Sequence, residues 1–253
     1  MDKNFENTLL ENWANEMQLM ANHYREPILT EKVTSLMKLA CDTFKQDVQV
    51  FFLSAELAER YIYIKESRLE KIEDPFLTVC VIIFIMSKYF GGGADLKIPI
   101  IEKFMLKISG INYNAFTIMQ YEKEILSVLQ YKLTFSTVMD DLDIFFEKFS
   151  REYRLKEVLR PLCTELLILI YCTRQQWFET LKILYKDDED TFESLICSKL
   201  FLPAGILITA FKSTNYQFIL DIDGLLQDLK VFTKIHPAHI HALSAIISDL
   251  MRE

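Results

Sequence analysis

Three groups of residues carry side chains or backbone that could bind a ligand or take part in a reaction. The first is the glycine-rich run at residues 91–95 (Gly-Gly-Gly-Ala-Asp). A phosphate-binding loop needs a Lys-Ser or Lys-Thr after its glycines, and a dinucleotide-binding turn needs spaced glycines. The run meets neither requirement, so it predicts a turn between two helices.

The second group is a set of three histidines near the C-terminus: His236, His239 and His241. A zinc site needs further ligands, yet no cysteine or carboxylate stands at ligand spacing nearby. Pro237 follows the first histidine and marks the start of a helix. The spacing therefore favours a surface cluster over a metal site, and we expect no cofactor.

The third group consists of charged residues at helical positions. Asp140, Asp141 and Asp143 open a helix, where the helix dipole favours carboxylates, so we expect a structural role. Glu122 lies mid-helix beside an apolar stripe, and Lys88 closes a wholly apolar segment. From the residues alone, both charges are expected to reach the surface or to pair locally.

No set of residues combines a nucleophile, an acid or base and an orienting group, so a helical enzyme is the weakest of the functions considered. The net charge is −8, from 28 basic and 36 acidic residues. An acidic chain without a basic cluster is a poor candidate for binding a phosphate backbone directly. We therefore expect a non-catalytic protein whose partners are other proteins.

The five cysteines are far apart, and none forms a Cys-x-x-Cys pair. Their apolar surroundings predict buried free thiols in a reducing, intracellular compartment. The N-terminal residues lack the apolar core of a signal peptide. The most apolar run, residues 76–86, is shorter than the about 20 residues that span a bilayer. It predicts a buried core helix, and no membrane contact is expected.

Composition and periodicity both predict an all-α protein. Apolar residues make up 51% of the chain, with only six glycines and six prolines, which favours long helices over strands and tight turns. In the first half, apolar residues recur at helical spacing in five segments. These are residues 33–44, 50–64, 76–90, a short stretch after Pro99, and 113–131.

The second half has a similar layout without any residue-level repeat. Its predicted helical segments are residues 136–150, 155–181, 190–212, 217–231 and 237–252. Pro203 and Gly205 predict a kink or a break in the third of these. With an amphipathic helix at residues 1–23, the chain is expected to divide into all-helical halves at 24–134 and 135–253.

These segments resemble a cyclin. Residues 57–62 (Leu-Ala-Glu-Arg-Tyr-Ile) resemble the second-helix signature of the cyclin box, residues 80–89 its buried third helix, and residues 121–129 its fifth helix. The resemblance implies two five-helix cyclin boxes, the second one divergent. In cyclins, the lysine that ends the third helix and the glutamate of the fifth reach the partner kinase. The resemblance thus makes Lys88 and Glu122 a candidate kinase-facing pair.

A narrower resemblance concerns the cyclin N-terminal-domain-containing proteins of meiosis. Residues 24–27, 79–81 and 202–207 carry it. It implies a nuclear protein at meiotic chromosomes, which promotes crossover designation and maturation by recruiting recombination proteins, with or without a cyclin-dependent kinase. The alternative is a kinase-activating cyclin of a cell-cycle or other pathway, including a viral one.

The first helix departs from the pattern of cell-cycle cyclins. Where those proteins carry an apolar docking patch with a tryptophan, this chain has Leu29, Val33 and Leu36. The arginine that would pair with an acid of the second helix is absent, although Glu59 stands at the acid's position. The three residues therefore form a candidate degenerate docking patch.

Overall fold

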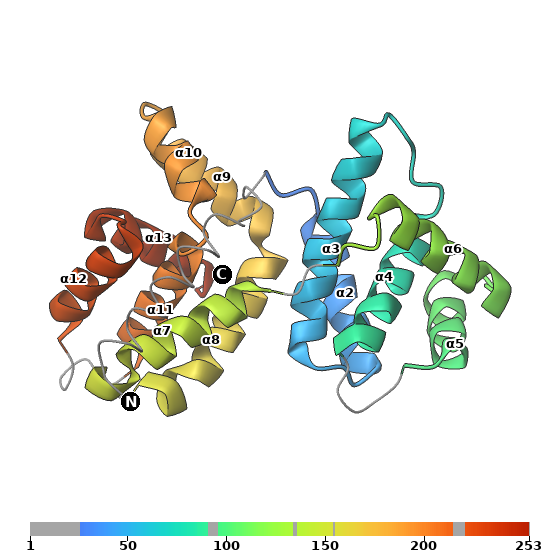
Figure 1. Ribbon diagram of the computed structural model, residues 1–253, viewed down its shortest axis with the longest axis horizontal. Helices are drawn as coiled ribbons and strands as arrows, with labels where there is room; N and C mark the ends of the chain where they lie inside the picture. Colours follow the sequence, from blue (N-terminus) through green and yellow to red (C-terminus); the bar gives the residue numbers. More distant parts are fainter. Residues whose placement is uncertain (1–25, 91–95, 134–135, 154, 215–220, 253) are drawn as a thin grey trace. The chain divides into compact units, whose positions relative to one another are not determined.

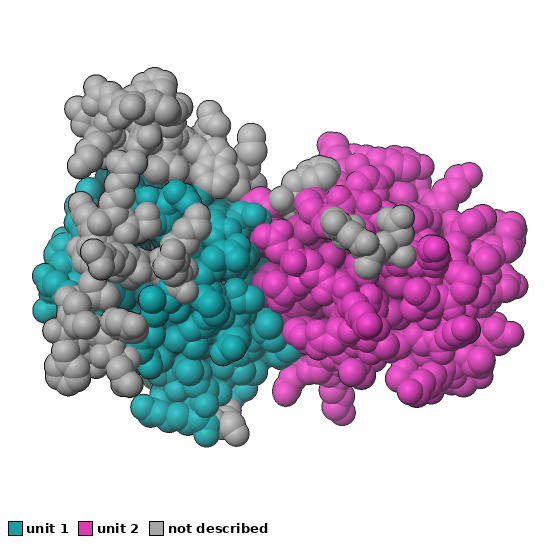
Figure 2. Space-filling view, turned by 90° about the horizontal axis from the view of Figure 1, so that it is seen from below, with its two compact units in different colours: residues 1–26, 138–253 teal, residues 27–137 magenta. Residues whose placement is uncertain are grey.

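The computed structural model describes residues 26–90, 96–133, 136–153, 155–214 and 221–252. Over these ranges the chain forms twelve helices and no strand, which confirms the predicted all-α class (Figure 1). The expected helix at residues 1–23 lies outside the described residues. The chain forms two compact units, coloured in Figure 2: unit 2 is Pro27–Thr137, and unit 1 contains Val138–Glu253.

Unit 2 is built around one buried helix. Its helices are α2 (Glu31–Thr43), α3 (Val48–Ser67), α4 (Pro75–Phe90), α5 (Ile98–Ser109) and α6 (Ala115–Val128). Figure 1 shows α4 between α3 and α6, and it also packs against α2 and α5. Every residue of α4 from Leu77 to Ser87 is buried, so the predicted core helix is confirmed.

Polar side chains fix where the helices of unit 2 begin. Asp47 and Asn114 cap α3 and α6 by accepting hydrogen bonds from backbone N–H groups two or three residues later. Asp74 caps α4 through the Leu77 N–H at 2.9 Å, and it also accepts a hydrogen bond from the Tyr113 hydroxyl just before α6. Asp74 thereby connects the starts of two helices that pack together.

Three helices of unit 2 end in the same way without glycine. After α3, the Leu69 N–H donates to the Glu66 carbonyl and the Glu70 N–H to the Lys65 carbonyl, each at 2.9 Å. This is the Schellman pattern, which requires a left-handed residue, and Leu69 takes that position with φ 57°. Corresponding hydrogen bonds follow α2 and α6, where Lys45 and Gln130 have positive φ.

Unit 1 is also built around one buried helix. Its helices are α7 (Val138–Tyr153), α8 (Leu155–Cys172), α9 (Arg174–Leu184), α10 (Glu189–Cys197), α11 (Phe201–Ser213), α12 (Ile222–Thr233) and α13 (Pro237–Leu250). All residues of α11 from Phe201 to Phe211 are buried, and α11 packs against α7, α8, α12 and α13. It is the counterpart in this unit of α4.

Two predicted segments of this half each comprise two helices. Residues 155–181 divide at Thr173 into α8 and α9, and residues 190–212 divide at 198–200 into α10 and α11. The predicted break at Pro203 and Gly205 is wrong, because α11 runs through both residues. Pro203 is the third residue of α11, where the backbone needs no N–H donor, so the proline is tolerated.

Gly205 lets α11 and α13 approach closely. A Cβ atom added at Gly205 would lie 2.5 Å from Cδ2 and 2.7 Å from Cγ of Leu243, which is fully buried on α13. One turn later, the Thr209 hydroxyl donates to the Gly205 carbonyl at 2.8 Å and lies 3.3 Å from the Ser244 carbonyl. The pairing of the two helices therefore depends on the absence of a side chain at position 205.

In the described part of the chain, no single helix is long and apolar enough to cross a membrane. The α10–α11 pair reaches the required length and composition only together, and it is bent by 83°.

Candidate functional site

Lys88 and Glu122 form an ion pair on the surface of unit 2. The Lys88 ammonium donates hydrogen bonds to both carboxylate oxygens of Glu122, at 2.7 and 2.8 Å. The Lys88 side chain is 42% exposed and that of Glu122 is 17% exposed. The two residues are 34 positions apart in sequence, and the packing of α4 on α6 brings them together.

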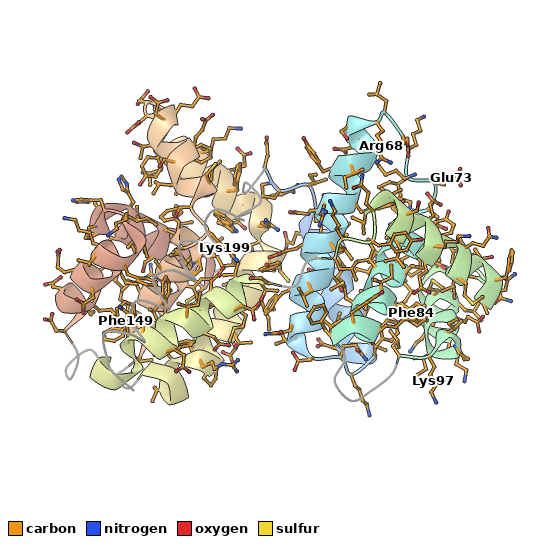
Figure 3. All side chains as sticks on the ribbon, viewed as in Figure 1. Arg68, Glu73, Phe84, Lys97, Phe149 and Lys199 are labelled. Carbon is orange, nitrogen blue, oxygen red and sulfur yellow. The ribbon has the colours of Figure 1, made fainter. Side chains whose placement is uncertain are left out.

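The helices that carry the pair also restrict its position. Lys88 is the first exposed residue after the buried core of α4, and it lies in the last turn, where the helix dipole favours a cation. Its ammonium is 3.8 Å from the centroid of the ring of Phe84, one turn earlier on α4. Figure 3 labels Phe84. Glu122 is flanked on α6 by the fully buried Ile118 and Ile125. These contacts limit the rotamers of both charged side chains.

Large apolar side chains that were not predicted as site residues are exposed near the pair. Tyr89 follows Lys88, and Met119 and Phe116 precede Glu122 by about one and two turns of α6. All three are more than half exposed. Their signal in the sequence is that Phe116 and Met119 lie off the apolar stripe of Ile118 and Ile125.

Further apolar residues on and after α5 are also exposed in unit 2: Ile100, Leu106, Ile108 and Ile111. Exposed apolar side chains with charged neighbours are typical of protein-binding surfaces. We call the set of Lys88, Tyr89, Phe116, Met119 and Glu122 the α4–α6 surface.

A second ion pair joins α6 to α3 and supports the first. Lys65, which is nearly buried, lies 3.0 Å from Glu124 and 3.0 Å from Glu70. Burial lowers the pKa of the Lys65 ammonium, but the hydrogen bonds that it donates to its two carboxylate partners outweigh burial and raise the pKa overall. Burial, and next the charge of Glu124, raise the pKa of Tyr61 to about 12. Glu122 and Glu124 thus connect α6 to α4 and α3.

The candidate docking patch has little exposed apolar surface. Leu29 is buried, while Val33 and Leu36 are partly exposed on α2. Glu59, at the position of the cyclin helix-two acid, lies 3.3 and 3.4 Å from the backbone N–H groups of Ile28 and Leu29. This carboxylate holds the backbone that precedes α2.

The other candidate residues take structural positions in unit 1. Asp141 and Asp143 pair with Lys199 (3.2 Å) and with Arg160 (2.9 Å), respectively. His239 Nδ1 is 2.6 Å from the Tyr185 hydroxyl, and His241 Nδ1 is 2.9 Å from the Lys212 ammonium. Among the described residues, no group of three or more His, Cys, Asp or Glu side chains is placed to hold a metal ion.

All five cysteines are free thiols. Cys41, Cys80 and Cys163 are buried, as predicted, and Cys172 and Cys197 are partly exposed. Burial raises the pKa of the three buried thiols to about 12, so they are protonated at neutral pH and are poor nucleophiles.

The architecture is that of a cyclin. The structure matches the X-ray structure of a viral cyclin from herpesvirus saimiri with a TM-score of 0.66 and 16% sequence identity, over 96% of this chain and 97% of that chain. The family model described as cyclin, N-terminal domain, matches residues 7–134. The chain therefore belongs to the cyclin family, whose members are regulatory proteins and not enzymes. No curated protein matches the sequence.

Proposed function

We propose that this protein binds a cyclin-dependent kinase through the α4–α6 surface. The observation that carries the proposal is the ion pair of Lys88 and Glu122, which is oriented by its helices, partly open to solvent, and next to exposed apolar side chains. Family membership supports the same class of partner. The exposed apolar side chains would be buried against the kinase, and the charged pair would fix the orientation in which the kinase binds.

The surface requires no chemistry from this chain. An ammonium has three donors and a carboxylate has about four acceptor positions, so both groups of the pair can form additional hydrogen bonds with a partner helix. A kinase that is held more tightly in its active than in its inactive conformation shifts towards the active one. The protein would thus act on phosphorylation only through binding.

The test is binding to a panel of purified cyclin-dependent kinases, with kinase activity measured in parallel. Lys88→Glu places two carboxylates together and should weaken the complex at least tenfold. Arg160→Glu is the matched control, because it breaks the ion pair with Asp143 in unit 1 and Arg160 is about as exposed as Lys88. This variant should bind the kinase as the wild type does. The proposal fails if no kinase binds the wild type, or if Lys88→Glu binds as well as the control.

A second candidate is the meiotic role, with recombination proteins as partners and the nucleus as location. Its support is the sequence resemblance at residues 24–27, 79–81 and 202–207. Residues 79–81 and 202–207 are buried in α4 and α11. The resemblance there concerns packing and not a surface that a partner could reach, so we rank this role below kinase binding.

The meiotic role is tested by recovering tagged protein from meiotic cells under mild conditions and identifying the bound proteins by mass spectrometry. Recombination proteins without a kinase would favour a scaffold that has kept the cyclin fold. In that case the Lys88→Glu variant should recover the same proteins. A stoichiometric kinase that is lost from this variant would favour the first proposal.

A further inference from the structure

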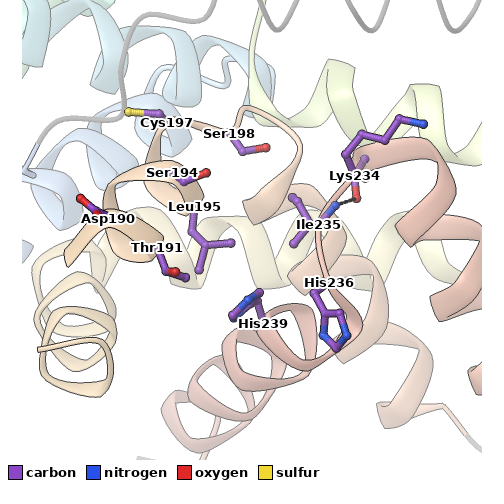
Figure 4. A pocket seen from close by; sticks show the side chains of 11 residues that line it. Asp190, Thr191, Ser194, Leu195, Cys197, Ser198, Lys234, Ile235, His236 and His239 are labelled. Atoms are coloured by element: carbon purple, nitrogen blue, oxygen red, sulfur yellow. Dashed lines mark hydrogen bonds between the residues drawn. The ribbon is translucent and has the colours of Figure 1, made fainter. Parts of the chain in front are cut away.

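A cleft of about 590 Å³ lies within unit 1, between α10 and the segment that joins α12 to α13 (Figure 4). This volume falls within the range of about 300–1,000 Å³ that is common for binding pockets. Three hydroxyl side chains line the wall formed by α10 and the residue after it: Thr191, Ser194 and Ser198. The opposite wall includes Ile235, His236 and His239, which places two of the three clustered histidines at one site.

Ser198 has an unpaired polar atom in this cleft. The residue is only 8% exposed, and its buried Oγ atom has no hydrogen-bond partner. A buried polar group without a partner costs about 1–3 kcal/mol. Figure 4 shows Ser198 beside the wall formed by α10. A ligand that donates a hydrogen bond to Ser198 Oγ would remove that cost.

The surroundings of the cleft are negatively charged. Five carboxylates lie on α10 and the turn before it: Asp187, Asp188, Glu189, Asp190 and Glu193. Lys199 pairs with Asp141 at 3.2 Å, and Lys234, which also lines the cleft, donates to the Val231 carbonyl at 2.8 Å and keeps its positive charge, so the carboxylates outnumber it. Burial, and next the neighbouring His236, lower the pKa of His239, which favours its neutral form.

We propose that the cleft binds an arginine side chain of a partner protein. A guanidinium has five N–H donors, no acceptor and a permanent positive charge. It therefore matches a cleft whose lining offers the Ser198, Ser194 and Thr191 hydroxyl oxygens and the Asp190 carboxylate. The site shares no residue with the α4–α6 surface, so the proposal holds whether or not a kinase binds there.

The first test is an NMR titration of the ¹⁵N-labelled full chain with the peptide acetyl-Ala-Ala-Arg-Ala-Ala-amide. Citrulline replaces arginine in the control peptide, which keeps the shape and removes the charge. We expect the amide signals of Thr191, Ser194 and Ser198 to shift with the arginine peptide, and the citrulline peptide to bind at least fivefold more weakly. Equal binding of the two peptides, shifts confined to other residues, or no shift at millimolar peptide would overturn the proposal.

Three variants separate the cleft from general attraction to an acidic surface. Asp190→Asn should weaken binding of the arginine peptide at least fivefold. Ser198→Val should weaken binding of the arginine peptide about threefold. This variant should fold, because Ser198 has an extended backbone that a β-branched residue adopts readily. Glu165→Gln, at an exposed position of α8, is the charge-matched control. The proposal is wrong if Glu165→Gln weakens binding as much as Asp190→Asn does.

Discussion

At the scale of single residues, Leu69 occupies a position that its residue type disfavours. It is 94% exposed and has φ 57° in the Schellman turn after α3, where glycine is usual. A left-handed conformation costs a residue with a side chain about 1 kcal/mol relative to glycine. We therefore predict that Leu69→Gly raises the free energy of unfolding by about 1 kcal/mol in urea titrations.

The neighbouring Arg68 provides the control for this prediction. Arg68 has φ −96°, a conformation that any residue adopts, so there is no backbone strain at this position for glycine to relieve. Arg68→Gly should leave stability unchanged or lower it, because glycine loses more chain entropy on folding. Equal effects of the two glycine substitutions would show that the positive φ of Leu69 carries no cost.

Buried thiols and phenols predict a fall in stability at alkaline pH. Burial raises the pKa of Cys41, Cys80 and Cys163 to about 12 from an ordinary value near 9. Burial, and next the hydrogen bond to Asp74, raise the pKa of Tyr113 to about 12 from 10. As the pH rises, these groups ionise in the unfolded chain before they ionise in the folded protein. Their contribution to the free energy of unfolding is therefore complete below pH 9 and is lost between about pH 9 and 12.

This pH dependence can be measured by urea unfolding at pH 8, 10 and 11. Tyr113→Phe removes one of the titrating groups and leaves Asp74 able to cap α4. We expect the variant to be less stable at pH 8, because its hydrogen bond to Asp74 is lost, and to lose less stability than the wild type between pH 10 and 11. An identical pH profile for the two proteins would contradict this assignment.

At the scale of helices, the contact between α11 and α13 gives a prediction whose sign changes with context. In an ordinary helix, Gly→Ala stabilises by about 1 kcal/mol. Here the new methyl group would overlap Leu243, and overpacking of this kind costs about 1–3 kcal/mol. Gly205→Ala should therefore lower the free energy of unfolding in the wild type. In a Leu243→Ala background Cγ and Cδ2 are absent and only the Cβ atom at 3.3 Å remains, which a shift of a few tenths of an ångström accommodates, so the same substitution should stabilise.

The helices also show which parts of the fold could be predicted from the sequence. The core helix α4 was predictable because residues 76–86 are apolar on every side, a pattern that only a surrounded helix satisfies. The division of α8 from α9 was not, because helical apolar spacing continues across Thr173, and no glycine or proline marks the break. Pro203 gave a false break, because its effect depends on its place in the helix, which the sequence does not show.

The candidate site was predictable to a similar extent. Helical spacing placed Glu122 beside a buried stripe, and the resemblance to cyclins paired it with Lys88. The distance of 2.7 Å between them depends on the packing of α4 on α6, which spacing along one chain cannot give. The exposed Phe116 and Met119 were missed because apolar residues are expected in the core.

At the scale of the whole molecule, the chain combines two helical units, each with a buried central helix, α4 or α11. The residues that carry the two proposals lie in different units: Lys88 and Glu122 in unit 2, and the cleft at Ser198 in unit 1. A protein with two such surfaces could bind a kinase and a second, arginine-bearing protein at once. The kinase-facing surface is the central claim.

The most direct test of that claim is hydrogen–deuterium exchange of the full chain, alone and saturated with the kinase that binds it most tightly. We predict slower exchange at the end of α4, residues 84–90, and along α6, residues 115–126, with no change in α12 and α13. Protection at these segments should be absent when the kinase is added to Lys88→Glu. Protection confined to other helices of unit 2, or to unit 1 alone, would contradict the account.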